Sequence, residues 1–140
     1  MRKLYLTLGI VVVMAATLIW IWPWIKMDIA DSAYYTEQDT PEYAFYTPKI
    51  LKEMPRISAE YTFSFKNIMG PDIQVHEVTF YNTRDTQNIE AYLSSMGYLR
   101  QNKCSSDLVC WRGAEAEQTI YVGHLTSEKA VIVQVVEEYH

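Results

Sequence analysis

An uncharged run from Leu4 to Ile25 constrains this chain more than any other feature of the sequence. Arg2 and Lys3 precede the run, and Lys26 follows it. As an α-helix the run would be about 33 Å long, enough to cross the hydrocarbon core of a bilayer with some tilt. The sequence therefore predicts an N-terminal transmembrane helix, with the lipid bilayer as the partner of residues 4–25.

A cleavable signal peptide is the alternative interpretation of this run. Its apolar core is shorter, and it ends at a site with small residues. Val13 and Ala15 provide such a site, but cleavage there would leave an apolar N-terminus in water. We therefore expect residues 1–26 to be an uncleaved signal-anchor.

Basic residues set the expected orientation of the anchor. Arg2, Lys3 and the terminal amine favour a cytoplasmic N-terminus, because positive charge is retained on that side of the membrane. Trp20, Trp22 and Trp24 then mark the outer interface, where indole rings are enriched. We expect a single-pass protein of the bacterial inner membrane, with residues 27–140 in the periplasm.

The exported part is acidic. All 17 Asp and Glu follow the anchor but three of the 12 Lys and Arg flank it, so the exported part carries a formal charge of about −8. This charge argues against nucleic acid as a partner, because phosphates need clustered lysine and arginine. It suits a basic protein partner, although solubility alone would also explain it.

Two cysteines, Cys104 and Cys110, lie in the exported part. Their spacing is neither the redox pattern C-x-x-C nor a zinc-ligand pair with a second pair downstream. In an oxidising compartment they are expected to form a structural disulfide, and this is one reason to favour a periplasm over a Gram-positive surface.

The segment from residue 27 to 48 is rich in acid and tyrosine, and we interpret it as a linker. Its first half is expected to be extended and mobile. The aromatic-rich segment Glu42–Tyr46 is expected to pack on the domain, because flexible tethers are poor in aromatic residues. A binding arm that orders on a partner is the alternative interpretation.

Residues 49–140 are expected to form one extracytoplasmic α+β domain, an antiparallel sheet with one packed helix in the order β-β-α-β-β-β-β. In the first strand Tyr61, Phe63 and Phe65 alternate with polar residues. Ile89, Tyr92, Leu93 and Met96 form one helical stripe, and Gly97 is a natural stop. The expected strands are 58–66, 73–81, 98–103, 108–112, 119–125 and 129–138, with polar turns at 113–117 and 126–128.

No motif for catalysis, phosphate binding or metal binding occurs in the sequence. The histidines His76, His124 and His140 have no assembled partners, and Glu60 with Glu77 is more typical of a solvated sheet face than of a glycosidase pair. We therefore predict no catalytic residue, no metal ligand and no cofactor.

Tyrosine accounts for 11 of the 140 residues, and Tyr, Trp and Arg are enriched at protein interfaces. Trp111 and Arg112, beside the expected disulfide, are candidate binding residues, and so are Tyr43 and Tyr46. Burial of Trp111 against the disulfide is the competing interpretation.

These observations favour a membrane-anchored periplasmic protein-binding module, not an enzyme. It would inhibit or hold another envelope or secreted protein, and immunity proteins against exported toxins are one class with these properties. An accessory subunit docking through its transmembrane helix is the first alternative, and a small envelope hydrolase is the second.

Overall fold

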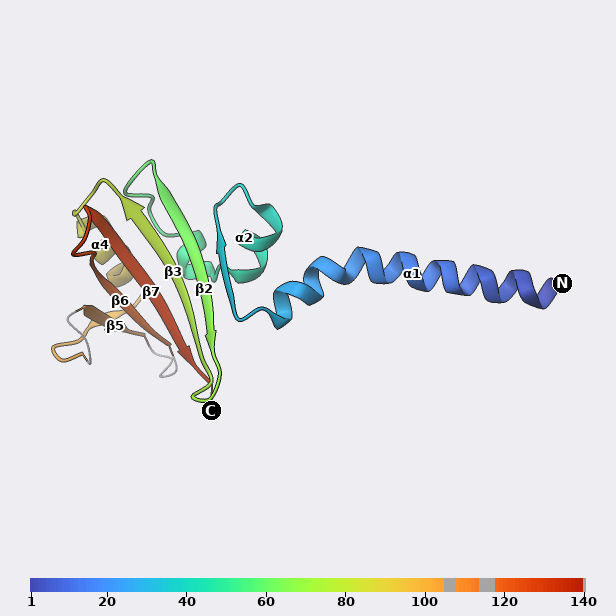
Figure 1. Ribbon diagram of the computed structural model, residues 1–140. Helices are drawn as coiled ribbons and strands as arrows, with labels where there is room; N and C mark the ends of the chain where they lie inside the picture. The colour runs from blue at the N-terminus through green and yellow to red at the C-terminus, as the bar shows by residue number, and fades with distance from the viewer. Residues whose placement is uncertain (105–107, 114–117, 140) are drawn as a thin grey trace. The chain divides into compact units, whose positions relative to one another are not determined.

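The computed structural model describes residues 1–104, 108–113 and 118–139. The chain divides into two compact units, Met1–Ala30 and Asp31–His140. The first unit is one helix, α1 (Arg2–Ile29), which contains the predicted apolar run (Figure 1). It is long and apolar enough to cross a membrane. Ala30 is extended and ends the helix.

The second unit is built on a seven-stranded antiparallel sheet in the order β1-β2-β3-β7-β6-β5-β4. The predicted α+β class is confirmed, and so are the six expected strands, each within a few residues of its expected bounds. The strands are β1 (Ser32–Tyr35), β2 (Tyr61–Ile68), β3 (Ile73–Tyr81), β4 (Leu99–Arg100), β5 (Val109–Arg112), β6 (Gln118–His124) and β7 (Ala130–Glu138). Of the expected turn at 113–117, residues 114–117 lie outside the described residues.

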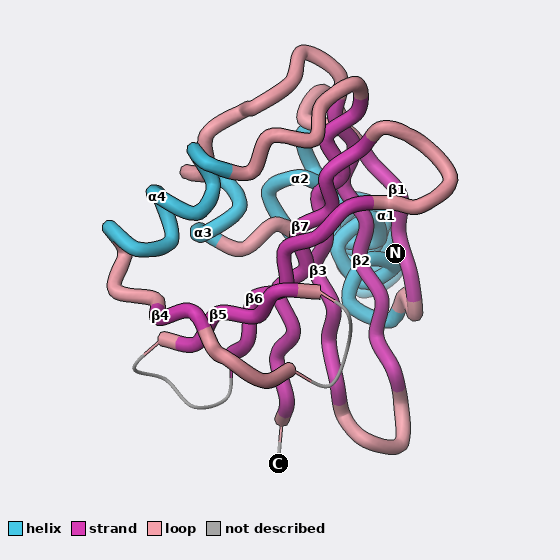
Figure 2. The backbone as a smooth tube through the Cα atoms, turned by 90° about the vertical axis from the view of Figure 1, so that its left-hand side faces the viewer, coloured by secondary structure: helices cyan, strands magenta, loops and turns pink. Residues whose placement is uncertain are grey.

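Within the described residues three helices accompany this sheet, where the sequence predicted one: α2 (Thr40–Tyr46), α3 (Lys49–Lys52) and α4 (Gln87–Ser95). Figure 2 shows α3 and α4 on the same side of the strands. The Tyr92 hydroxyl of α4 donates to the carbonyl of Ile50 in α3 at 2.9 Å, which ties the two helices together. The predicted helix is α4, and its stripe residues Ile89 and Leu93 are fully buried.

One face of the sheet carries the core, and we name it the covered face. Residues directly opposite each other in an antiparallel pair share a face, so the register assigns every side chain. Phe63 of β2 lies opposite Val78 of β3, which lies opposite Val133 of β7. The largest side chains of this face are almost completely buried: Phe63, Phe80, Ile120, Val78, Val131, Val133 and Val135.

The central strand is β7, which lies between β3 and β6. The ladder between β2 and β3 runs from Tyr61↔Phe80 to Ile68↔Ile73 without interruption. The pairing of β3 with β2 therefore contains no bulge, and the apolar residues of β3 lie on both faces of the sheet.

The tyrosine-rich segment differs from the expectation of a mobile first half. Residues Ser32–Tyr35 form β1, which pairs with β2 through Tyr35↔Phe63 and Ser32↔Lys66. Helix α2 follows, and its Tyr46 ring stacks on Phe65 with the ring centroids 4.7 Å apart. The expected packing of the 42–46 aromatics on the domain is confirmed for this residue.

Candidate functional site

The second face of the sheet, here named the open face, carries a row of polar side chains. Cross-strand pairing places Tyr34 of β1 opposite Ser64 of β2, Ser64 opposite Glu77 of β3, and Glu77 opposite Gln134 of β7. Directly opposed Cβ atoms lie about 5 Å apart, so these side chains are immediate neighbours. The row joins two hydroxyl groups, a carboxylate and an amide across four strands.

A cavity of about 510 Å³ lies above this row, and we name it the open-face cavity. Ser64, Glu77 and Tyr34 line one part of it. The next cross-strand row, Thr62, Thr79 and Ile132, lines another part, together with Tyr81 and Leu125. The lining therefore combines hydroxyl groups with aliphatic and aromatic surface, as ligand sites in proteins do.

Glu77 supplies the negative charge on the floor of the cavity. Its Oε2 accepts a hydrogen bond from Gln134 Nε2 at 2.7 Å, and its Oε1 accepts a long one from Thr79 Oγ1 at 3.4 Å. The side chain is half-buried. In the described part of the chain Glu77 has no ion-pair partner, so its charge is not neutralised within the domain.

Ser64 is the second distinctive residue of the cavity. It is only 8% exposed, although it lies on the face without helices. Among the described residues no protein group hydrogen-bonds to the Ser64 hydroxyl, which lines the cavity and keeps contact with solvent there.

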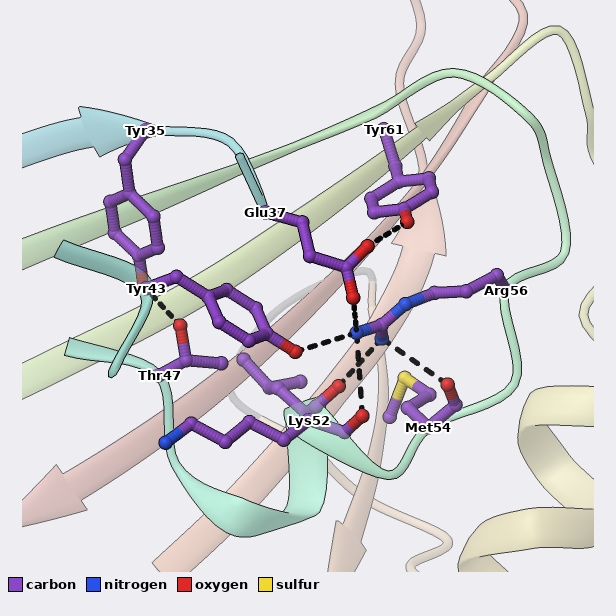
Figure 3. A network of polar contacts seen from close by, with 9 residues as sticks. Tyr35, Glu37, Tyr43, Thr47, Lys52, Met54, Arg56 and Tyr61 are labelled. Carbon is purple, nitrogen blue, oxygen red and sulfur yellow. Dashed lines mark hydrogen bonds and ion pairs between the residues drawn. The ribbon is translucent and has the colours of Figure 1, made fainter. Parts of the chain in front are cut away.

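A polar network around Arg56 fixes the segment that forms one rim of the cavity (Figure 3). The guanidinium donates to the Leu51 carbonyl at 2.7 Å and to the Tyr43 hydroxyl at 2.9 Å. It also lies 3.5 Å from the Glu37 carboxylate. Glu37 belongs to the turn between β1 and α2, and this turn contributes Thr36 and Asp39 to the lining.

Tyr61 completes that network. Its hydroxyl donates to Glu37, and this hydrogen bond raises the pKa of Tyr61 above its ordinary value of 10.0. The Arg56 guanidinium lies over the Tyr61 ring, 5.2 Å from its centroid. The turn is thus held from both sides, and the rim of the cavity is positioned by a rigid scaffold.

A separate polar cluster lies at the end of the covered face. His76 Nδ1 donates to the Tyr46 carbonyl at 2.7 Å, and its Nε2 lies 3.7 Å from Glu137 Oε2. Glu137 also accepts from Gln118 Nε2 at 3.0 Å and from the Tyr139 hydroxyl at 2.7 Å. The contact with His76 is the largest cause that lowers the pKa of Glu137 to about 2, against partial burial, which raises it.

The four predicted binding residues are distributed over different environments. Trp111 is 5% exposed and Tyr46 is 4% exposed, so both are part of the core. Tyr43 is half-buried and accepts from Arg56. Arg112 is exposed, and strand alternation directs it to the face opposite Trp111. The structure therefore does not bring these residues together as one surface.

Burial of Trp111 agrees with the core placement in the competing interpretation, but Cys110 precedes it in β5, so strand alternation directs the two side chains to opposite faces. Cys104 and Cys110 are bonded, as predicted, with their Cα atoms 6.0 Å apart. The indole Nε1 of Trp111 is buried with no hydrogen-bond partner among the described residues.

The residues considered for catalysis do not converge. Glu77 lies on the open face and His76 on the covered face, whereas Glu60 accepts from Asn82 Nδ2 at 3.2 Å and His124 is exposed. His140 lies outside the described residues. In residues 1–104, 108–113 and 118–139, no group of three or more His, Cys, Asp or Glu could hold a metal ion.

Sequence reasoning considered Glu77 but missed Ser64. Both were interpreted as part of a solvated strand face. Alternation of apolar and polar residues distinguishes the two faces of a strand, but it does not predict how deeply the side chains of each face are buried. A serine opposite a glutamate in the expected hairpin is a common surface pattern, so the sequence carried no specific signal for a cavity.

A scan of the chain against protein-family models gave no match, and neither did searches of curated proteins and of solved structures.

Proposed function

We propose that this chain is a membrane-tethered binding module that holds another envelope protein through the open face of its sheet. The observation that carries the proposal is the open-face cavity, a hollow of about 510 Å³ on the face on which α2, α3 and α4 do not pack. A sheet face left uncovered and hollowed in this way offers a partner both surface area and polar groups to recognise.

Charge supports a protein partner with basic character. Among the described residues, the carboxylates that line the cavity are those of Asp39 and Glu77, and no lysine or arginine lines it. The exported part as a whole carries a formal charge of about −8. Complementary potentials speed encounter and suppress wrong partners, and a basic partner is the one that this surface suits.

The proposed location is the periplasmic side of a bacterial inner membrane, with the N-terminus in the cytoplasm. Arg2 and Lys3 before the apolar helix support this orientation. The disulfide between Cys104 and Cys110 supports an oxidising compartment. In this arrangement α1 is a tether that keeps the binding domain near envelope proteins.

Site-specific photo-crosslinking in intact cells tests this function. A photoreactive residue replaces Tyr34, which is 79% exposed beside the cavity. Matched controls carry it at Met96, which is 46% exposed just after α4, and at Trp20, which is 79% exposed in α1. We expect one protein, identified by mass spectrometry, to crosslink at position 34 and not at position 96.

The three positions separate the competing functions. Crosslinking of the same protein at position 20 alone would replace the proposal with that of an accessory subunit that docks through its helix. Equal crosslinking at positions 34 and 96 would show non-specific contact and would overturn the proposal, as would no crosslink at position 34.

A further inference from the structure

We propose that the open-face cavity is a lysine-recognition site, in which Glu77 and Ser64 bind the ammonium group of a lysine on the held protein. This inference rests on the proposed function, because it names the chemistry by which the partner is recognised. It goes beyond that function by assigning the ligand group and the residues that contact it.

The first argument is the unused hydrogen-bonding capacity of the floor. Ser64 is 8% exposed and its hydroxyl has no recorded partner within the described residues. Its cross-strand neighbour Glu77 is half-buried and lacks an ion pair within that same part of the chain. A half-buried carboxylate gains from a cation that also hydrogen-bonds to neighbouring polar groups, and an ammonium with three donors does both.

The second argument concerns which cation fits. Glu77 Oε2 already accepts a 2.7 Å hydrogen bond from Gln134, whereas Oε1 has only the 3.4 Å contact with Thr79. An arginine fork binds best when both carboxylate oxygens are free to accept in parallel. The more available single oxygen Oε1, together with the hydroxyl of the cross-strand neighbour Ser64, matches a compact point charge such as a lysine ammonium.

The third argument is the apolar part of the lining. Ile132 and Leu125 line the same cavity, together with the ring of Tyr81. The four-carbon stem of a lysine packs along such surface while its charged end reaches a polar group. Exposed Tyr34 at the start of the polar row adds a ring face that attracts a cation. The cavity thus offers a site for each part of the side chain.

Fluorescence anisotropy with a labelled hexalysine peptide tests the assignment, using the full-length protein in zwitterionic nanodiscs at physiological salt. Glu77→Gln removes the charge but keeps an acceptor for Gln134, and we expect about tenfold weaker binding, the order of one charged hydrogen bond. Ser64→Ala is expected to weaken binding by about threefold, in keeping with a neutral hydrogen bond. Glu128→Gln, an equal charge change at an exposed turn, is expected to leave affinity within about twofold.

Two altered peptides complete the test without changing the protein. Hexalysine acetylated at every Nε is expected not to bind, and hexaarginine is expected to bind more weakly than hexalysine. Equal losses for Glu77→Gln and Glu128→Gln would overturn the site, because they would indicate general charge attraction. Binding of hexaarginine as tight as that of hexalysine would overturn the ammonium assignment, and so would binding of the acetylated peptide.

The result also separates this inference from the proposed function. If Glu77→Gln weakens neither hexalysine binding nor the crosslink at position 34, the inference fails and the proposed function stands. If hexalysine binds through Glu77 but no protein crosslinks at position 34, the lysine site stands and the proposed function fails.

Discussion

The Arg56 guanidinium holds together pieces of the domain that come from different segments. It donates to the carbonyls of Leu51 and Met54 and to the Tyr43 hydroxyl, and it pairs with Glu37. Replacement by methionine keeps much of the apolar stem but removes all five donors. We expect Arg56→Met to lower the free energy of unfolding by about 2 kcal/mol, measured by urea denaturation at pH 7.

Arg84→Met is the matched control, because Arg84 is exposed and the same charge is lost. Its expected change is within about 0.5 kcal/mol. Arg56→Lys is expected to lower the free energy of unfolding almost as much as Arg56→Met, since an ammonium cannot reproduce the planar fork of the guanidinium. Equal effects of Arg56→Met and Arg84→Met would show that the network contributes no stability of its own.

Glu137 makes stability depend on pH in the acid range. Its folded-state pKa is lowered from 4.5 to about 2, so the folded state favours the charged carboxylate. The resulting stabilisation is complete above pH 4.5 and is lost as the pH falls through the folded pKa. Because the side chain is 24% exposed, we expect its contribution to be about 1–2 kcal/mol after discounting for solvent.

Urea denaturation of wild type and Glu137→Gln at pH 7 and pH 2.5 measures this contribution. The variant is expected to be less stable than wild type at pH 7, with the difference largely gone at pH 2.5. Glu128→Gln, at an exposed turn, is expected to match wild type at both values. A difference for Glu137→Gln that persists unchanged at pH 2.5 would assign the effect to packing and not to charge.

Helix α4 is held on the sheet by a narrow stripe of apolar side chains. A nine-residue helix is too short to be stable alone, so packing must supply its stability. Leu93 is 0% exposed, and Leu93→Ala is expected to cost about 3 kcal/mol through lost burial and the cavity left behind. Thermal and urea unfolding measure this loss of stability. The control is Ser94→Ala, because Ser94 is the next residue and is exposed, and its free energy of unfolding is expected to stay close to that of wild type. Comparable losses in the two variants would mean that the stripe does not hold the helix.

Elements with strong local patterns were predicted well from the sequence. The alternation of Phe63 and Phe65 with polar residues identified β2, and the Ile89–Leu93 stripe before Gly97 identified α4. Gly97 has φ +89°, a conformation that glycine adopts at no steric cost. These features depend on neighbours in sequence, and this is the reason that pattern reasoning succeeded.

Features that depend on distant pairing were missed. Strand β1 has four residues and no alternation of apolar and polar residues. It forms a strand because it pairs with the edge of β2. Trp111 and Arg112 were grouped because they are adjacent in sequence, but adjacency along a strand directs side chains to opposite faces. The depth of Ser64 depends on how β1, β2 and β3 come together, which no local pattern encodes.

At the scale of the whole molecule, function depends on which side of the membrane the domain occupies. The proposed orientation follows from two positive residues, Arg2 and Lys3, before an apolar helix. The oxidation state of the cysteine pair shows which side of the membrane the domain occupies, without a fused reporter protein. Disulfides persist in the periplasm, whereas cytosolic reductants keep thiols reduced. The redox state of Cys104 and Cys110 in cells is therefore a readout of topology.

Alkylation with a thiol-reactive polyethylene glycol after acid quenching measures this state by gel shift. We expect wild type to remain unmodified until a reductant is added, because its two cysteines are paired. A variant with Arg2→Glu and Lys3→Glu loses the orienting charges, so we expect a large fraction of its domain to stay in the cytoplasm and be doubly modified. A variant with Arg84→Glu and Lys129→Glu changes charge equally, but far from the anchor, and is expected to behave as wild type. Wild-type protein that is modified without reductant would place the domain in the cytoplasm, where the lysine site would meet a different set of partners.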